Sequence, residues 1–346
     1  MKPEYLLQQN FDLRHLNSFG ISAQAHRYVR IESLSQLQAL RTQLQADTDL
    51  SQLPRLILGG GSNMILSEHL PHIVLHIAIM GRQLKAETSD AFIVRAGAGE
   101  NWHQFVLWTL AHGYPGLENL SLIPGTVGAS PIQNIGAYGL EMQDYFDSLR
   151  ALDMQTGEVK TFTKQDCAFA YRDSIFKSGE PGRYVILDVC FALPKQWQAR
   201  LNYGDVAKYL QAHNVATPTP IDVSNAIIAI RQSKLPDPAL IGNAGSFFKN
   251  PIVTADLRDQ LLRQYPACVS YPQANGDYKL AAGWLIEQCG WKGYSAATVG
   301  VYEKQALVLI NLGGANGAAV KQLAQAIQAD VLAKMGVSLE VEPVFV

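Results

Sequence analysis

The chain has 346 residues, of which 48% are hydrophobic and 17% charged, and its formal net charge is -2. This balance excludes a disordered chain, and the near-zero charge argues against nonspecific binding of nucleic acid. The four cysteines form no Cys-x-x-Cys pair, so neither a zinc site nor a redox dithiol is predicted. No apolar run approaches membrane-spanning length, and the first residues lack the apolar core of a signal peptide. We therefore expect a soluble cytoplasmic protein with no membrane partner.

Apolar periodicity predicts an N-terminal region of mixed helices and strands. A helix over 33–46 is capped by Ser33, and a short strand over 54–58 runs directly into a glycine loop at 59–63. Strands are expected at 64–66, 72–77 and 91–96, followed by a helix over 100–112 and a long loop over 115–139. Three more strands are expected at 148–154, 158–163 and 184–193.

The pattern of helices and strands in the C-terminal third predicts a separate α+β unit there. A capped helix over 222–233 precedes a glycine-rich loop at 242–251, and a short helix is expected over 281–289. A buried strand over 305–311 and a long helix over 317–335 follow, and 337–346 is a last extended piece. His72 and His76 lie four residues apart on one strand, too far for an easy chelate, so no metal site is expected.

Two loops are candidates for binding a large anionic ligand. The loop at 59–63, Gly-Gly-Gly-Ser-Asn, can bring backbone N–H groups against a phosphate, although such a turn alone is most often only a turn. The loop at 121–139 is rich in small residues and carries no charge, which favours packing against a flavin or a pyrophosphate over an unliganded Ω-loop. Neither loop has the Gly-x-Gly-x-x-Gly spacing, so a non-Rossmann dinucleotide cofactor is favoured.

Three further segments carry polar groups that suit catalysis. In 242–251, Ser246 follows two glycines and precedes two phenylalanines, and the alternative is a glycine turn before a buried strand. Arg172 lies beside Tyr171 and could hold an anion, or it could belong to a surface turn. Glu340 and Glu342 alternate along one strand face, which is also the pattern of a solvated edge strand.

Taken together, these segments resemble the bacterial UDP-N-acetylenolpyruvoylglucosamine reductase family, in its longer subtype with a tyrosine loop over the substrate. The resemblance spans nearly the whole chain and rests on 59–63, 123–128, 133–139, 171–176 and 242–251. It implies an α+β fold with a two-part FAD-binding module of the vanillyl-alcohol-oxidase type. The implied parts are FAD subdomains over 1–70 and 71–220 and a substrate domain over 221–346, whose last few residues return to the FAD module.

The resemblance also implies a reaction. NADPH reduces the bound FAD and leaves, and UDP-N-acetylglucosamine-enolpyruvate then receives a hydride at its vinyl carbon C3. The product is UDP-N-acetylmuramate, a precursor of peptidoglycan. A monomer is expected, with a UDP-sugar as its small-molecule partner.

Site residues are implied by matching the family's motifs. Ser246 would be the proton donor, Arg172 would bind the developing enolate, and Glu342 would be a carboxyl near the same atoms. Tyr203, Lys234, Asn250 and Tyr271 would hold the substrate. FAD would contact Gly59, Gly60, Gly61, Ser62, Asn63, Ile123, Pro124, Gly125, Thr126, Gly128, Ala129, Ser130, Gly136, Ala137 and Tyr138.

One departure and two alternatives stay open. The family usually continues with Val-Arg after the second glutamate, whereas here Pro343-Val344 follows, so Glu340 stays an alternative to Glu342. An oxidase or dehydrogenase of the same flavin fold, acting on an alcohol or sugar, would keep the glycine loops but has no need of Ser246 or Arg172. A non-enzymatic UDP-sugar binding protein would not need the FAD loops at all.

Overall fold

The computed structural model describes residues 5–202 and 204–346 of the chain. Contacts between residues divide the chain into two compact units, each built from separate stretches of sequence. Unit 1 comprises the residues up to Phe11, Ala25–Gly60 and Pro71–Ser233. Unit 2 comprises Asp12–Gln24, Gly61–Leu70 and Lys234–Val346. The predicted division into 1–70, 71–220 and 221–346 stays a prediction.

The first sheet of unit 1 has the strand order β1-β2-β5-β3. Its strands are β1 (Gln8–Asp12), β2 (Gln24–Ile31), β5 (His69–Ile77) and β3 (Arg55–Leu58), and β3 runs parallel to β5. Helix α1 (Leu34–Ala46) begins as predicted at Ser33, whose side chain accepts the Gln36 N–H at 3.2 Å. Leu37, Leu40 and Leu44 are buried in one core with residues of the strands. This burial explains the spacing of apolar residues along α1.

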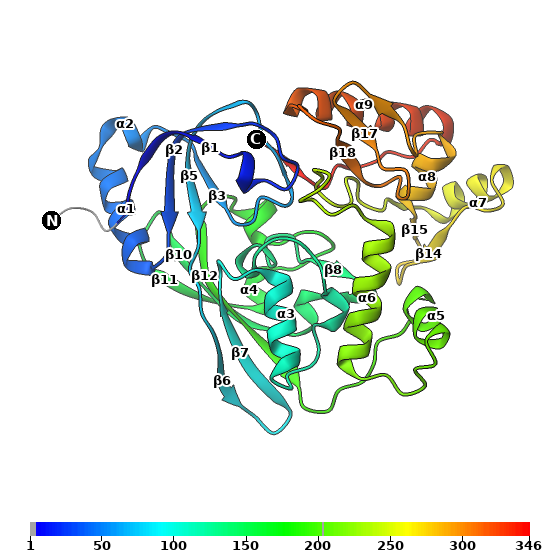
Figure 1. The fold of residues 1–346 in the computed structure, drawn as a ribbon, viewed down its shortest axis with the longest axis horizontal. Helices are drawn as coiled ribbons and strands as arrows, with labels where there is room; N and C mark the ends of the chain where they lie inside the picture. The colour runs from blue at the N-terminus through cyan, green and yellow to red at the C-terminus, as the bar shows by residue number, and fades with distance from the viewer. Residues whose placement is uncertain (1–4, 203) are drawn as a thin grey trace. The chain divides into compact units, whose positions relative to one another are not determined.

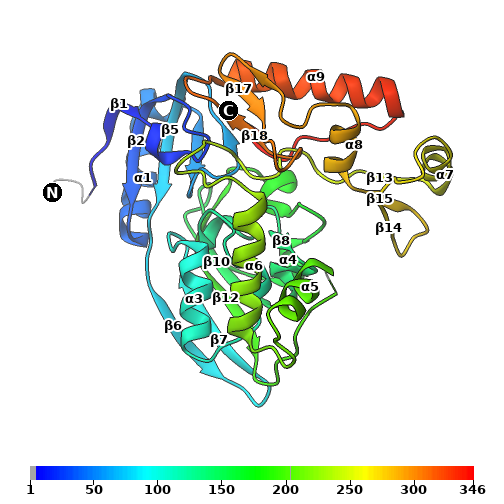
Figure 2. The same cartoon turned by 45° about the vertical axis from the view of Figure 1, so that its right-hand side comes forward.

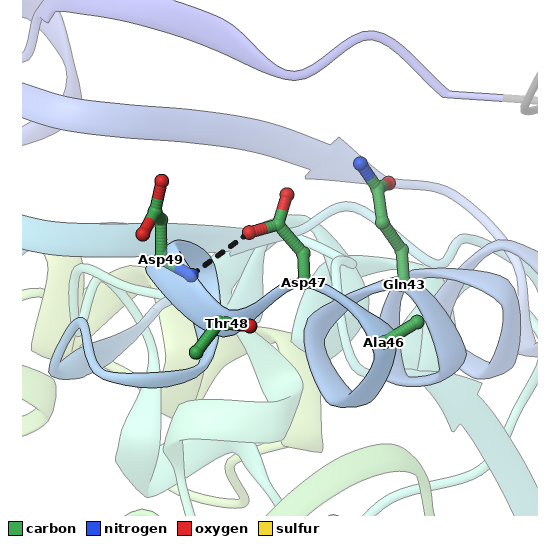
Figure 3. A pocket seen from close by; sticks show the side chains of 5 residues that line it. All are labelled: Gln43, Ala46, Asp47, Thr48 and Asp49. Atoms are coloured by element: carbon green, nitrogen blue, oxygen red, sulfur yellow. Dashed lines mark hydrogen bonds between the residues drawn. The ribbon is translucent and has the colours of Figure 1, made fainter.

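Helix α2 (Thr48–Ser51) follows α1 after one residue, Asp47. The Asp47 carboxylate accepts the N–H groups of Asp49 and Leu50, each at 3.0 Å, and Figure 3 shows the bond to Asp49. A surface hollow of about 430 Å³ at this junction is lined by Gln43, Ala46, Asp47, Thr48 and Asp49. Because the Asp47 carboxylate serves as a helix cap, we assign no ligand to this hollow.

The second sheet of unit 1 is antiparallel, with the order β11-β10-β12-β7-β6. The strands are β6 (Arg82–Glu87), β7 (Ala91–Gly97), β10 (Phe146–Asp153), β11 (Val159–Thr163) and β12 (Tyr184–Pro194). The central strand β12 is buried from Tyr184 to Phe191. Helix α3 (Trp102–Ala111) packs on it, because the rings of Trp102 and Phe105 lie 5.8 and 5.4 Å from that of Phe191.

Three more helices complete unit 1: α4 (Lys164–Cys167), α5 (Gly204–Ala212) and α6 (Pro220–Lys234). Helix α6 begins two residues before the predicted 222, because Thr219 and Asp222 exchange side-chain bonds with each other's backbone N–H groups. Helices α5 and α6 share an apolar cluster that includes Val206, Leu210 and Ile227. Figures 1 and 2 both show α6 alongside α3.

Unit 2 contains two three-stranded sheets, one two-stranded sheet and three α-helices within its described residues. One sheet has the order β13 (Ile252–Val253), β15 (Tyr278–Leu280), β14 (Ser270–Pro272), and the other runs β16 (Ser295–Ala296), β17 (Val299–Val301), β18 (Leu309–Asn311). The helices are α7 (Ala255–Gln264), α8 (Ala282–Gln288) and α9 (Gly317–Met335). The C-terminal strand β19 (Val344–Phe345) pairs in parallel with β4 (Met64–Ile65), and a two-stranded β8 (Gly136–Ala137)–β9 (Leu140–Glu141) pair lies in unit 1.

One element prediction is wrong in its extent. The strand predicted over 305–311 is a strand only at Leu309–Asn311, because the backbone turns at 303–304 and again at 306–307. Val308 is still buried, so the apolar residues of this segment correctly indicated burial but not the extent of the strand. The helix predicted over 317–335 is confirmed residue for residue, and Gly336 ends it with a φ of 65°. No helix in the described part of the chain is long and apolar enough to cross a membrane.

Candidate active site

The glycine loop after β3 touches the long neutral loop inside unit 1. A Cβ on Gly59 would lie 2.6 Å from Thr126 Oγ1, and one on Gly60 would lie 3.0 Å from the Gly125 Cα. Only glycine allows the two backbones this approach. The fold therefore brings together two predicted cofactor-binding segments, 59–63 and 121–139, which are far apart in the sequence.

The rest of the glycine loop belongs to unit 2. Gly61 has a φ of 57°, and a Cβ there would lie 2.0 Å from the Leu16 carbonyl oxygen. The Asn63 side chain donates to the Glu342 carbonyl at 3.2 Å, and the Asn63 carbonyl accepts the Val344 N–H at 3.0 Å. Asn63 therefore holds the end of the glycine loop, next to Ser62, against the C-terminal segment. Both residues are also predicted FAD contacts.

The neutral loop at 121–139 is held by backbone bonds to the junction of β7 and α3. Trp102 N–H donates to the Gly125 carbonyl at 3.1 Å, and Gly128 N–H donates to the Ala98 carbonyl at 2.9 Å. Leu122, Asn134 and Tyr138 all have φ between 45° and 60°. Left-handed backbone at residues other than glycine is strained, and such strain gathers at ligand sites. This loop carries the predicted contacts Ile123, Pro124, Gly125, Thr126, Gly128, Ala129, Ser130, Gly136, Ala137 and Tyr138.

The donors of this region fit a flavin dinucleotide. Thr126 Oγ1 is buried and has no hydrogen-bond partner among the described residues, so a hydroxyl is available to a bound group. The loop has no carboxylate that would repel a diphosphate. The Ser130 hydroxyl, another predicted contact, already donates to the Val127 carbonyl at 2.8 Å.

Arg172 is presented on a strained turn of unit 1. Ala170 and Asp173 form a bridge across this turn, and Arg172 has a φ of 56°. Its Nη2 donates to the Gly136 carbonyl at 2.6 Å, and its guanidinium lies 5.2 Å from the centre of the Tyr171 ring. The guanidinium is therefore fixed against the neutral loop, which suits a group that meets developing negative charge.

Ser246 is held rigidly in unit 2. Gly245 before it has a φ of 69°, and the Gly245 N–H donates to Asn243 Oδ1 at 3.0 Å. Phe247 and Phe248 after it are 0% and 1% exposed, and their rings meet edge to face. The serine itself is exposed. The loop thus displays one hydroxyl on a backbone that two buried aromatic side chains anchor.

The C-terminal segment lies antiparallel to this loop. Glu342 N–H donates to the Phe247 carbonyl and Lys249 N–H donates to the Glu340 carbonyl, each at 2.9 Å. Glu342 is therefore hydrogen-bonded through its backbone to Phe247, the residue after Ser246. Glu340 lies three residues along the loop, where its 70% exposed carboxylate forms an ion pair with Lys249.

The predicted substrate residues lie on separate elements. Lys234 is the last residue of α6, and Tyr271 lies on β14 with 47% of its surface exposed. Asn250 is in the Ser246 loop, and its Oδ1 accepts the Ala282 N–H at the start of α8 at 3.0 Å. Tyr203 lies outside the described residues. Their assignment to the substrate stays a prediction.

Sequence reasoning missed one polar residue near the neutral loop. Arg231 lies on α6 in unit 1, and its Nε is buried without a hydrogen-bond partner among the described residues. The available signal was a single charge after the run Ala226-Ile227-Ile228-Ala229-Ile230, which an ordinary surface helix would not show.

Two family models match the chain. One, described as an FAD binding domain, matches residues 25–163, and the other, the C-terminal domain of UDP-N-acetylenolpyruvoylglucosamine reductase, matches 237–346. The UDP-N-acetylenolpyruvoylglucosamine reductase of Burkholderia orbicola is 55% identical over 331 residues, which are 95% of this chain and 93% of the relative. The reductase of an Azoarcus species is 53% identical over 99% of both chains.

The solved structures agree on the fold. The UDP-N-acetylenolpyruvylglucosamine reductase of Thermus caldophilus covers 99% of each chain with a TM-score of 0.68 at 20% identity. The expected α+β fold with an N-terminal FAD-binding module is thereby confirmed, and so is an FAD-dependent oxidoreductase acting on a UDP-sugar. The two alternatives, an alcohol or sugar oxidase and a non-enzymatic binding protein, are not supported. The chain belongs to the UDP-N-acetylenolpyruvoylglucosamine reductase family.

Proposed function

We propose that the chain catalyses the NADPH-dependent reduction of UDP-N-acetylglucosamine-enolpyruvate to UDP-N-acetylmuramate in the cytoplasm, as a step of peptidoglycan precursor synthesis. The observation that carries this proposal is the exposed Ser246, fixed between Gly245 and Phe247 and paired next to Glu342. Bound FAD would supply the hydride chemistry that links NADPH to the enolpyruvyl group. The use of NADPH and the monomeric state follow from the family resemblance and stay predictions.

The reaction needs a proton at C2 once a hydride has been added at C3. Hydride addition places negative charge on C2 and on the adjoining carboxylate. A serine hydroxyl is too weak an acid for a neutral alkene, but it can protonate a carbanion. Ser246 suits this role because its hydroxyl is exposed while its backbone is held on both sides.

Glu342 is the better candidate for the second carboxyl group. Its N–H is bonded to Phe247, the residue after Ser246, and its carbonyl accepts from Asn63. Glu340 is offset toward Lys249 and engaged in an ion pair there. The register therefore favours Glu342 as the group that holds or relays the Ser246 proton.

Arg172 suits the stabilisation of the enolate. A guanidinium keeps its charge at all working pH values and presents several N–H donors in one plane. Its Nη1 and Nη2 donate to the Asn134 and Gly136 carbonyls at 3.5 and 2.6 Å, and these bonds orient the guanidinium. Fixed donors stabilise developing charge without reorganising during the reaction.

Substrate binding is proposed for Lys234, Asn250, Tyr271 and Tyr203. A lysine and tyrosine hydroxyls match diphosphate and sugar oxygens. The side-chain Oδ1 of Asn250 accepts the Ala282 N–H, which leaves the side-chain NH2 group as the part that can reach a ligand.

The test separates the two half-reactions in Ser246→Ala. We expect flavin reduction by NADPH within about threefold of wild type and reoxidation by the enolpyruvyl substrate slowed by at least ~100-fold, as for loss of a proton donor. Both are followed by stopped-flow absorbance of the flavin under anaerobic conditions. Ser295→Ala, an exposed serine of β16, is the matched control and should leave both rates unchanged. Equal losses in both halves would make Ser246 a structural residue and contradict the role.

A further inference from the structure

The turn that carries Arg172 is attached to the neutral loop on both sides of that residue. Before Arg172, the Ala170 carbonyl accepts a bond from Asn134 Nδ2 at 3.1 Å. After Arg172, the Ser174 hydroxyl donates to the Ile132 carbonyl at 2.7 Å. These two bonds fix the backbone of the turn, and with it the Cα of Arg172, against the loop.

Asn134 is buried, and its contacts determine how its amide is oriented. The residue is 0% exposed. Its Oδ1 accepts the Gln143 N–H at 3.2 Å, and its Nδ2 donates to the Glu141 carboxylate at 2.8 Å as well as to Ala170. Both N–H donors of the amide are therefore used, and the reversed amide would set an oxygen against two acceptors. The φ of Asn134 is 45°, a left-handed value that asparagine tolerates.

Asn134 also contacts the other end of Arg172. The guanidinium donates from Nη1 to the Asn134 carbonyl at 3.5 Å and from Nη2 to the Gly136 carbonyl at 2.6 Å. Asn134 thus holds the turn of Arg172 through its side chain and meets the guanidinium through its backbone. A shift of Asn134 would displace the arginine at both ends.

Glu141 holds the Asn134 amide in place. Its Oε2 accepts from Asn134 Nδ2 and from Gln143 Nε2 at 2.8 and 2.6 Å. Glu141 lies opposite Gly136 in the β8–β9 pair. A Cβ on Gly136 would lie 3.0 Å from both Arg172 Nη1 and Glu141 Cγ, so the two side chains meet at this glycine. Because a charged acceptor makes a stronger hydrogen bond than a neutral one, Glu141 is an effective anchor for the amide.

We propose that Asn134, oriented by Glu141, is a positioning residue that sets where the Arg172 guanidinium meets the developing enolate. It acts through Arg172 and not on the substrate itself. Donors stabilise developing charge only where they are held in place, and a misplacement of about 1 Å can cost about 100-fold in rate. This inference rests on the proposed role of Arg172, and Arg172→Ala tests that role by itself.

The test compares variants of the flavin-loaded, full-length protein in the two half-reactions, followed by anaerobic stopped-flow absorbance. Asn134→Gly removes the amide and keeps the left-handed backbone without strain. Glu141→Ala removes the anchor of the amide, whereas Glu141→Gln keeps a side-chain oxygen that can accept the bond from Asn134. Asn214→Gly is the matched control, because it makes the same change at an exposed asparagine with a φ of 58°.

The expected losses fall on one half-reaction. Asn134→Gly should slow reoxidation by the enolpyruvyl substrate at least ~10-fold and leave flavin reduction by NADPH within about threefold of wild type. Glu141→Ala should slow reoxidation about 5- to 10-fold, and Glu141→Gln should recover most of that loss. Asn214→Gly should match wild type in both halves. A crystal structure of Asn134→Gly should show the guanidinium displaced from the Gly136 carbonyl.

A double-mutant cycle distinguishes positioning from a general loss of structure. Arg172→Ala alone should slow reoxidation at least ~100-fold. Adding Asn134→Gly to Arg172→Ala should slow it by less than about twofold more, because no guanidinium is left to position. A residue that merely stabilises the fold of the loop would cost the same factor in both backgrounds.

Three results would overturn the proposal: reoxidation of Asn134→Gly within about twofold of wild type, an equal slowing in the Arg172→Ala background, or an unmoved guanidinium in the crystal structure. If Asn134→Gly does not fold, Asn134→Asp is measured under the same criteria, because it keeps the Oδ1 acceptor and removes both N–H donors. Reoxidation of Arg172→Ala at the wild-type rate would contradict the proposed role of Arg172, and this inference would fall with it. A slow Arg172→Ala beside an unaffected Asn134→Gly would overturn this inference alone.

Discussion

At the scale of single residues, the pairing of the C-terminal segment favours one of two candidate glutamates. Glu342 is bonded to Phe247 and Glu340 is paired with Lys249, so the two carboxylates differ in position along the Ser246 loop. The sequence could not decide between them, because the choice depends on how two segments about 90 residues apart pair with each other.

The pairing of the C-terminal segment with the Ser246 loop leads to a prediction for Glu342, with Glu340 as the control. Glu342→Gln should lower the rate of flavin reoxidation by the substrate about 100-fold and flatten the basic limb of the rate profile. Glu340→Gln should stay within twofold of wild type, since it removes only an exposed ion pair. The measurement is reoxidation rate against pH. The reverse order of effects would assign the role to Glu340.

A second residue controls stability at acid pH. Asp153 is fully buried and accepts bonds from Arg183 and Lys160 at 2.8 and 3.0 Å. Hydrogen bonds from Arg183 first, and from Lys160, hold the pKa of Asp153 far below its usual range. A depressed carboxyl pKa stabilises the folded state above the unfolded-state pKa of about 4, and this stabilisation is lost as the pH falls below it.

Asp153→Asn should therefore destabilise the protein on the order of 3 kcal/mol at pH 7, because the bonded cations lose their anion. The difference in free energy of unfolding between wild type and variant should shrink as the pH falls below about 4. Denaturant titrations at a series of pH values measure it, with the exposed Asp147→Asn as control. A difference that is constant with pH would contradict this account of Asp153.

At the scale of elements, capped apolar helices could be predicted and polar elements could not. The α1 and α9 helices follow from a cap and a repeating buried face. The α7 helix and strand β6 were missed because each buries almost nothing: Leu261 is the buried residue of α7, and β6 has none. The sequence pattern also did not predict strands β1 and β2 or helix α5.

The same limit applies to the active-site elements. The two glycine loops were predictable because small uncharged residues are unusual in a long surface loop. Their contact at Gly60 and Gly125 was not, since it depends on tertiary packing. Arg231 was missed because an arginine on a helix is ordinarily exposed, and only the packed structure shows that its Nε is buried.

The close approach of loops can be tested by one added methyl group. A Cβ at Gly128 would lie 2.5 Å from the Ala98 Cβ, so Gly128→Ala should displace the neutral loop, release FAD and lower the melting temperature. Gly204→Ala meets nothing within 4 Å and should keep both properties. Flavin content after gel filtration and thermal unfolding measure the two effects. Full flavin content in Gly128→Ala would show that the loop does not contact the cofactor.

At the scale of the whole molecule, each unit is assembled from segments distant in sequence. Unit 2 takes Gly61–Leu70 from the N-terminal half, where β4 pairs with the C-terminal β19. The glycine loop at 59–63 therefore spans the boundary between the two units in sequence. Family membership establishes an FAD-dependent reductase of a UDP-sugar, and the residue roles are the proposed refinement.

The most direct test of the account is an anaerobic titration of the flavin-loaded wild type. NADPH should bleach the flavin absorbance, and one equivalent of UDP-N-acetylglucosamine-enolpyruvate should restore it without oxygen and yield UDP-N-acetylmuramate. Flavin that NADPH reduces but that only oxygen reoxidises would contradict the proposed function.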